Sequence, residues 1–222
     1  MGRAPRINVV DGIYHLTARG VRRAPIYEDG LDYQRFQLFF REVAGELGWA
    51  CHSFCQMPNH YHLLVETRLP NLSAGMQQLN WRHAVRFNWR HGYTGHLFES
   101  RFHSELIETE AHFLETARYI VLNPVRAGLC THPADWPFSS YRRTLVPGDP
   151  VVASSRLLAH FGNDPEKARG RYEAFVAEGV ASSRVLVPGT RTRLDQPKPY
   201  VPAKRSARSR TRRAAGSPTT LR

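Results

Sequence analysis

Two histidines separated by one residue, His60 and His62, are the side chains of this sequence best suited to bind a metal ion. They follow the turn residues Pro58 and Asn59 and belong to a run of aromatic and aliphatic residues that predicts a β-strand. Because alternate side chains of a strand share a face, the two imidazoles are expected side by side, opposite a core face that carries Tyr61, Leu63 and Val65. Such a pair is half of a metal site and needs a third ligand. The same spacing also fits two ordinary polar residues on the solvent face of a sheet.

A tyrosine and an asparagine further along the chain could complete such a site. The stretch 110–123 predicts a helix with an apolar stripe made of Phe113, Ala117, Ile120 and Val121. Tyr119 and Asn123 are four residues apart and therefore stack on another side of this helix, together with Glu115. The amide oxygen of Asn123 can bind a hard divalent cation, which would place Tyr119 beside whatever that cation holds. Taken alone, a tyrosine on an amphipathic helix is more often an interface residue. The helix is expected to end at Asn123, since Pro124 disfavours helical backbone at the preceding residue.

The elements that must position these side chains alternate between a period of two and a period of 3.6 residues. Strands are predicted at 13–20, 49–56 and 60–66, helices at 32–47 and 72–90, and a half-buried strand or bent strand pair at 97–108. Arg101, His103 and Glu105 are expected on one face of this last strand. In chain order the pattern is βαββαβ, so we predict a ferredoxin-like antiparallel sheet of the α+β class, with helix 110–123 added to it. Two further helices at 154–161 and 165–178 are expected to dock on the domain.

The composition indicates a globular protein with a separate basic tail. Eleven of the 31 Lys and Arg residues, but one of the 19 Asp and Glu residues, lie within 181–222, so this segment holds +10 of the net charge of +12. Its Pro, Ser, Thr and Arg content predicts disorder, and its charge favours polyanions without selecting a sequence. We therefore divide the chain into a domain at 1–145, a helical extension at 146–180 and a disordered basic tail at 181–222. No apolar run is long enough to span a bilayer and the N-terminal residues lack a signal core, so we expect a cytoplasmic protein.

The three cysteines leave one thiol unpaired under any disulfide scheme. Cys51 and Cys55, four residues apart in the strand 49–56, are expected on the same face of that strand as buried reduced thiols. A mixed zinc site of Cys55 with His60 or His62 is an alternative.

Five stretches of the sequence, in chain order, resemble the HUH-type single-tyrosine transposases, in which U stands for a hydrophobic residue. The likeness is greatest to their REP-associated branch. The matching stretches are Tyr14–Gly20 (YHLTARG), Met57–Val65 (MPNHYHLLV), Gly95–Phe102 (GHLFESRF), Tyr119–Leu129 (YIVLNPVRAGL) and Trp136–Tyr141 (WPFSSY). The resemblance implies a ferredoxin-like, nucleoid-associated protein that cuts and rejoins single-stranded DNA beside a palindromic hairpin.

By this resemblance, His60 and His62 are the paired metal ligands, Asn123 is the third ligand and Tyr119 is the nucleophile. Many relatives carry the longer glutamine where this chain has Asn123. A divalent cation on these residues, Mg²⁺ or Mn²⁺ with the imidazoles favouring Mn²⁺, would stabilise charge on the scissile phosphate and orient it toward the tyrosine. Attack would give a 5′-phosphotyrosine and a free 3′-hydroxyl, and a later 3′-hydroxyl could reverse the step without ATP. The resemblance implies neither a membrane nor a small-molecule cofactor, and it leaves open a monomer or a homodimer.

Contacts to DNA are expected from six further side chains, namely His15, Arg19, Arg82, Arg86, Arg101 and Arg126. Arg82 and Arg86 lie on helix 72–90 among amides and tryptophans, a mixture that could follow a nucleic-acid backbone and stack bases. A solvated helix face gives the same pattern. Glu66 shares the predicted face of the histidines and could orient one of them.

Two other functions fit parts of the sequence. A hairpin-binding DNA protein that no longer cuts would need the fold, but not the intact set of His60, His62, Tyr119 and Asn123. An RNA-binding ferredoxin-like protein usually carries an aromatic run on its sheet, which these strands lack. The sequence therefore favours a metal-dependent single-tyrosine DNA endonuclease and strand transferase.

Overall fold

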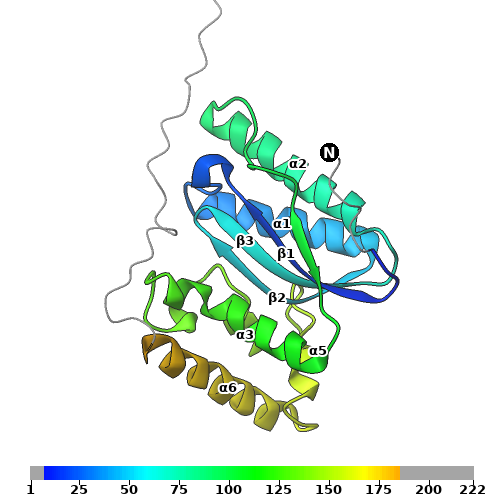
Figure 1. Cartoon of the computed structure of the whole chain (residues 1–222), viewed down its shortest axis with the longest axis vertical. Helices are drawn as coiled ribbons and strands as arrows, with labels where there is room; N and C mark the ends of the chain where they lie inside the picture. The colour runs from blue at the N-terminus through cyan, green and yellow to red at the C-terminus, as the bar shows by residue number, and fades with distance from the viewer. Residues whose placement is uncertain (1–7, 186–222) are drawn as a thin grey trace, which may run out of the picture.

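The computed structural model describes residues 8–185 and places a four-stranded sheet at the centre of the chain (Figure 1). Its strands are β1 (Gly12–Arg19), β2 (Trp49–Met57), β3 (His60–Thr67) and β4 (His103–Leu106), in the spatial order β2-β3-β1-β4. β2 and β3 form a hairpin, β1 lies between β3 and β4, and every pair is antiparallel. This is the order of a ferredoxin-like βαββαβ sheet, so the predicted fold class is confirmed.

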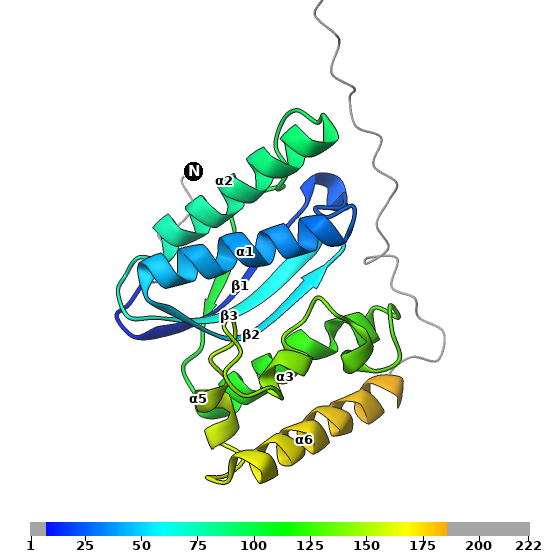
Figure 2. The same ribbon diagram turned by 180° about the vertical axis from the view of Figure 1, so that it is seen from behind.

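Helices cover both faces of the sheet and produce a layered molecule (Figure 2). One face is covered by α1 (Gly30–Leu47) and α2 (Leu72–His91). The other face is covered by α3 (Glu110–Arg126), against which α6 (Pro165–Val185) packs, while α5 (Ser154–Ala159) contacts both α6 and β2. The short elements η1 (Val21–Arg23), η2 (Pro133–Asp135) and α4 (Tyr141–Thr144) complete the connections. Among the described helices, none combines the length and the apolar character that a bilayer span requires.

Each face of the sheet has its own hydrophobic core. The core under α1 and α2 holds the apolar residues that periodicity predicted for these elements, among them Phe36, Phe40, Val43, Tyr61, Leu63, Val65, Met76 and Leu79. The core under α3 holds Leu64, Phe113, Ala117, Ile120, Val121, Leu157, Tyr172 and Val176. β3 is therefore buried on both faces. The alternative that His60 and His62 lie on a solvent face is wrong, since they are 9% and 6% exposed.

A β-bulge in β2 changes the expected positions of two cysteines. The pairing register with β3 shifts between Cys51 and Ser53, which turns the following side chains of β2 to the opposite face. Cys51 therefore lies in the core under α1 and α2 and Cys55 in the core under α3, so the expectation that they share a face is wrong. Both thiols are free and buried, as predicted. Burial raises the pKa of Cys55 well above its usual range, which disfavours the thiolate that a zinc site needs.

Helix α3 does not end before Pro124, as the sequence predicted, but continues to Arg126. A proline in this position lacks the N–H that would bond the carbonyl of Ile120. The backbone N–H groups of residues 127–129 bond the last helical carbonyls, and both Leu122 and Pro124 are buried. Packing of this turn therefore offsets the missing bond. The extra turn places Arg126 on the same helix as Tyr119.

The region after α2 also differs from the prediction. The strand predicted over 97–108 covers only His103–Leu106, and the residues before it form an irregular segment bonded to the end of β1, where the Glu99 N–H donates to the Arg19 carbonyl. Because of this bend, Arg101 lines a groove beside α2 and does not share a face with Glu105. At the other end of the chain, α6 continues to Val185 instead of ending at residue 178. The remainder of the predicted basic tail, 186–222, lies outside the described residues, and the domain boundaries at 145 and 180 stay predictions.

The buried histidine of α2 gives a prediction for stability. His83 is 1% exposed and bonds the Ile26 carbonyl through Nε2 at 2.8 Å, and burial lowers its pKa from 6.5 to about 4. Because the unfolded chain binds this proton more readily, the contribution is complete above pH 6.5 and is lost as the pH falls toward 4. We expect His83 to account for a loss of about 2 kcal/mol between pH 7 and pH 5. Urea unfolding of wild type and His83→Gln at both pH values measures this contribution. An equal change in the free energy of unfolding between pH 7 and pH 5 in the two proteins would contradict it.

Candidate active site

His60 and His62 lie at the start of β3, directly after the turn that joins β2 to β3. Their side chains are on the face of the sheet that α3 covers. Across the strands, His62 lies opposite Thr17 and Cys55, and His60 lies opposite Arg19 and Met57. The two imidazole centroids are 5.0 Å apart, with ring planes at 79°. The i, i+2 spacing thus produces two adjacent, buried imidazoles, as strand geometry predicts.

Tyr119 approaches these imidazoles from α3. Its ring stands edge-on to His62 at 5.5 Å between centroids and edge-on to His15 at 6.0 Å. Tyr119 is 38% exposed, while its neighbours Ile120 and Val121 on the helix are fully buried in the core under α3. The guanidinium carbon of Arg126 lies 5.2 Å from the centre of the Tyr119 ring. The structure therefore brings a phenol from the helix to the imidazoles of the sheet.

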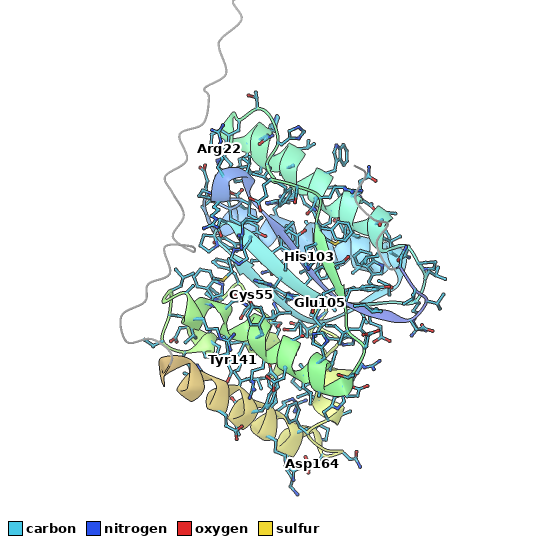
Figure 3. The ribbon with its side chains drawn as sticks, in the orientation of Figure 1. Arg22, Cys55, His103, Glu105, Tyr141 and Asp164 are labelled. Atoms are coloured by element: carbon cyan, nitrogen blue, oxygen red, sulfur yellow. The ribbon has the colours of Figure 1, made fainter. Side chains whose placement is uncertain are left out.

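A third imidazole belongs to the same cluster. The rings of His15 on β1 and His62 on β3 meet edge to edge, with 5.2 Å between ring centroids and 19° between planes, and Nε2 of His15 lies 2.9 Å from Nδ1 of His62. The other nitrogen of His15, Nδ1, lies 3.8 Å from a carboxylate oxygen of Glu105 on β4. A pocket of about 430 Å³ opens beside Tyr119 and is lined by His15, Glu105, Glu115, Thr116, Arg118, Tyr119 and Arg126. Figure 3 shows Glu105 and His103 on β4, near α3.

The nitrogen atoms of the pair fit a metal ion. The Nε2 atom of His62 is buried and has no hydrogen-bond partner among the described residues. Burial lowers the pKa of His62 well below its usual value, and the nearby His60 and His15 lower it further, so the ring is neutral and offers a lone pair. Nδ1 of His60 lies 2.7 Å from Oδ1 of Asn59, the kind of outer contact that fixes the orientation of a metal-binding imidazole.

A third ligand for such an ion would have to be of another type. In the part of the chain that the structure describes, no three His, Cys, Asp or Glu side chains are grouped so that they could hold one metal ion. Asn123 lies one turn after Tyr119 on α3, and its amide N–H donates to the Tyr119 carbonyl at 2.9 Å. Its amide oxygen is not used in that bond. An amide oxygen and the phosphate oxygens of a substrate are therefore the groups suited to complete the coordination.

Other candidate residues lie away from this cluster. Arg82 and Arg86 are on α2, across the sheet from α3; Arg82 forms an ion pair with Glu42 at 2.9 Å, and Arg86 covers the Trp89 ring at 4.6 Å. Glu66 shares the strand of the paired histidines, but its carboxylate accepts from His52 at 2.9 Å. It therefore orients a different histidine from the two that the sequence suggested.

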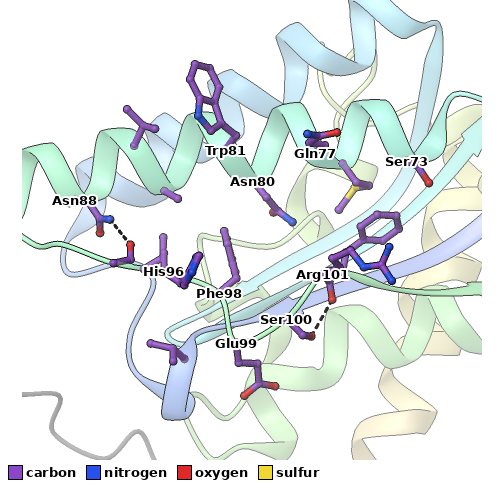
Figure 4. Close-up of a pocket in the computed structure, with 17 residues that line it drawn as sticks. Ser73, Gln77, Asn80, Trp81, Asn88, His96, Phe98, Glu99, Ser100 and Arg101 are labelled. Carbon is purple, nitrogen blue, oxygen red and sulfur yellow. Dashed lines mark hydrogen bonds between the residues drawn. The ribbon is translucent and has the colours of Figure 1, made fainter. Parts of the chain in front are cut away.

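A second concave surface, a groove of about 890 Å³, lies between α2 and the segment Gly95–Phe102. Figure 4 shows Asn80 pointing from α2 toward this segment, His96 and Phe98 pointing from the segment toward α2, and Glu99 pointing away from it. Arg101 and the 63% exposed Trp81 also line the groove. The segment is bonded to β1 at Arg19, which lies opposite His60, so it reaches the end of β1 beside which the histidine pair lies.

A ferredoxin-like sheet whose paired histidines meet a tyrosine on an added helix defines a transposase-like protein. The sequence matches the model of the IS200-like transposase family over residues 8–123, and the chain belongs to this family. The family indicated by the sequence motifs is thus confirmed.

Solved structures that are similar to this one include two that are named as transposases. The structure of a REP-associated tyrosine transposase bound to a REP hairpin aligns with a TM-score of 0.57 and 20% identity, over 67% of this chain and 88% of that chain. A transposase candidate from Deinococcus radiodurans R1 aligns with a TM-score of 0.39 and 20% identity, over 54% and 95% of the two chains. The first likeness establishes a shared fold. Among curated proteins, none matches the sequence.

Proposed function

We propose that this transposase-family protein cuts and rejoins single-stranded DNA beside a palindromic, REP-type hairpin through a covalent bond to Tyr119. The observation that carries the proposal is the approach of the Tyr119 ring to His62 at 5.5 Å, beside a buried and unpartnered His62 Nε2. Membership of the IS200-like family and the fold shared with a hairpin-bound REP-associated transposase support the choice of substrate.

The reaction balances as a transesterification. The Tyr119 oxygen forms a bond to the scissile phosphorus, the bond from phosphorus to the 3′ oxygen breaks, and that oxygen leaves as a 3′-hydroxyl with the proton that the phenol gives up. The 5′-phosphotyrosine keeps the energy of the phosphodiester, so a second 3′-hydroxyl can reverse the step and join the strands. Arg126, whose guanidinium lies 5.2 Å from the Tyr119 ring, would bind a phosphate oxygen of the strand.

His60, His62 and Asn123 would hold the divalent cation that this family generally uses. Mg²⁺ or Mn²⁺ there would supply charge stabilisation at the scissile phosphate, and two imidazole ligands favour Mn²⁺. The protein's part is to keep the His62 imidazole neutral by burial and to present Tyr119 from a helix whose other side is fixed in the core under α3.

Formation of a covalent adduct tests the proposal. Labelled single strands that carry a REP-type hairpin with randomised flanking bases are incubated with wild type and Mn²⁺, then separated by denaturing electrophoresis. We expect a protein–DNA band that EDTA prevents. A shift in native gels with no covalent band under any condition would identify a binding protein without nuclease activity, and a preference for the RNA version of the hairpin would identify an RNA-binding protein.

The groove beside α2 is expected to bind the single-stranded part of the substrate. Arg101 is exposed, has no acidic partner among the described residues and lies in a groove from which Glu99 points away, whereas Arg82 is already paired with Glu42 and Glu46. Arg101→Ala should weaken DNA binding roughly 3- to 10-fold. It should also reduce, by about one, the slope of the logarithm of the binding constant against the logarithm of the salt concentration, since one phosphate contact is lost. Fluorescence anisotropy across a salt series measures both quantities. Arg82→Ala is the matched control, and an equal loss in the two variants would contradict this DNA path.

A further inference from the structure

Three side chains on three strands form a line that ends at the unpartnered nitrogen of the candidate active site. β4 contributes Glu105, β1 contributes His15, and β3 contributes His62. The pairing register places Glu105 directly opposite His15, and His15 diagonal to His62. All three side chains lie on the face of the sheet that α3 covers, and two of them line the pocket beside Tyr119.

We propose that Glu105 and His15 are positioning residues that fix His62 in the tautomer whose bare Nε2 faces the metal site. The inference rests on the proposed function, because it assigns His62 to that site. Neither Glu105 nor His15 is required to touch the ion or the DNA. Their role is to decide which nitrogen of His62 carries the proton.

The line has a direction because its first member is a carboxylate. Its negative charge lies 3.8 Å from Nδ1 of His15, which is beyond hydrogen-bond distance but favours the tautomer of His15 that carries the proton on Nδ1. A neutral imidazole has one N–H, so Nε2 of His15 is left as an acceptor. Nδ1 of His62, 2.9 Å away, must then donate to it, and Nε2 of His62 is left with its lone pair.

The opposite assignment is unfavourable at a specific atom. If Nε2 of His15 donated, Nδ1 of His62 would accept and Nε2 of His62 would carry the proton. That N–H would be buried without an acceptor among the described residues. A protonated Nε2 also cannot bind a metal ion, whereas a bare Nε2 gains a partner as soon as an ion binds. The 19° angle between the ring planes suits this hydrogen bond, because an imidazole N–H lies in the plane of its ring.

The tautomer can be read directly in the metal-free protein. Long-range ¹H–¹⁵N correlation spectra of ¹⁵N-histidine-labelled wild type should show His62 protonated at Nδ1 and bare at Nε2. In His15→Leu, which removes the acceptor, the protonation of His62 should shift toward Nε2; His15→Gln, whose amide oxygen can accept, should restore the wild-type pattern. Protonation at Nε2 in wild type, or an unchanged pattern in His15→Leu, would overturn the proposal.

Metal binding supplies a second measurement. Mn²⁺ affinity, followed by the electron paramagnetic resonance signal of free Mn²⁺, should fall about 10- to 100-fold in His15→Leu and less in His15→Gln. Glu105→Ala should lower the Mn²⁺ affinity about 10-fold, and Glu105→Gln should bind Mn²⁺ more nearly like wild type. Because Glu105 is half-exposed, its variants also test the proposal if His15→Leu does not fold. Full affinity in both loss variants would overturn the positioning role. Wild type that shows the expected tautomer but binds no Mn²⁺ would instead contradict the metal site of the proposed function, so the two failures are distinguishable.

Discussion

Replacing Tyr119 by phenylalanine should abolish formation of the protein–DNA adduct and leave the fold and DNA binding nearly unchanged. The hydroxyl is the one group removed, and the ring contacts to His62, His15 and Arg126 are available to phenylalanine as well. Loss of the attacking oxygen removes the nucleophile itself, so we expect cleavage to fall on the order of 10⁴-fold or more. Denaturing gels measure the adduct and the cut strand, native gels measure binding, and mass spectrometry of the wild-type adduct locates the modified peptide.

Tyr61→Phe is the matched control for this experiment. Tyr61 lies on the opposite face of the sheet, is fully buried, and donates its hydroxyl to Asn80 at 2.6 Å. Removing that hydroxyl leaves Asn80, a residue of the groove beside α2, without this partner and should lower stability by about 1 kcal/mol, while the protein–DNA adduct still forms. Full cleavage by Tyr119→Phe, or equal loss in the two variants, would exclude Tyr119 as the nucleophile.

Local sequence patterns predicted the sheet and the two imidazoles because both depend on side-chain period. The alternation in β3 separates Tyr61, Leu63 and Val65 from His60 and His62, and the structure places the first three in the core under α1 and α2. The helical period in α3 likewise separates buried Ile120 from half-exposed Tyr119. A period of two or of 3.6 residues states which side chains share a face, and a resemblance in motifs then assigned roles to them.

The remaining features depend on pairings between distant parts of the chain. The β-bulge after Cys51 reverses the face of Cys55, and no local pattern announces it. The turn of α3 around Pro124 carries Leu122 and Ala127, which pack in one core with residues as distant in sequence as Leu157 and Tyr172. The sequence predicted His15 as a DNA contact and Glu105 on one face of a strand. That the two side chains lie opposite each other follows from the register of β1 with β4. Antiparallel pairing of the two predicted strands 13–20 and 97–108 in the correct register would have predicted that His15 and Glu105 lie opposite each other.

Replacing His62 by leucine is expected to separate function from stability. His62 is 6% exposed and its Nε2 has no partner among the described residues, so the native protein bears the cost of a buried, unsatisfied polar atom. Leucine removes that cost, although it also removes the partner of His15. The free energy of unfolding should therefore change by no more than about 1 kcal/mol. Mn²⁺ affinity should fall more than about 100-fold, beyond the effect of losing an outer partner, and adduct formation should fall with it.

Leu64→Ala provides the comparison two residues further along the same strand and on the same face. Leu64 is fully buried in the core under α3, and its truncation should cost about 2–5 kcal/mol of stability. As long as the variant remains folded, it keeps both imidazoles and should bind Mn²⁺ like wild type. Urea unfolding should thus show a loss of stability in Leu64→Ala alone, and Mn²⁺ titration should show a loss of affinity in His62→Leu alone. If His62→Leu instead lost several kcal/mol and kept its Mn²⁺ affinity, His62 would be a structural residue of the core, and the unpartnered nitrogen would have no connection with catalysis.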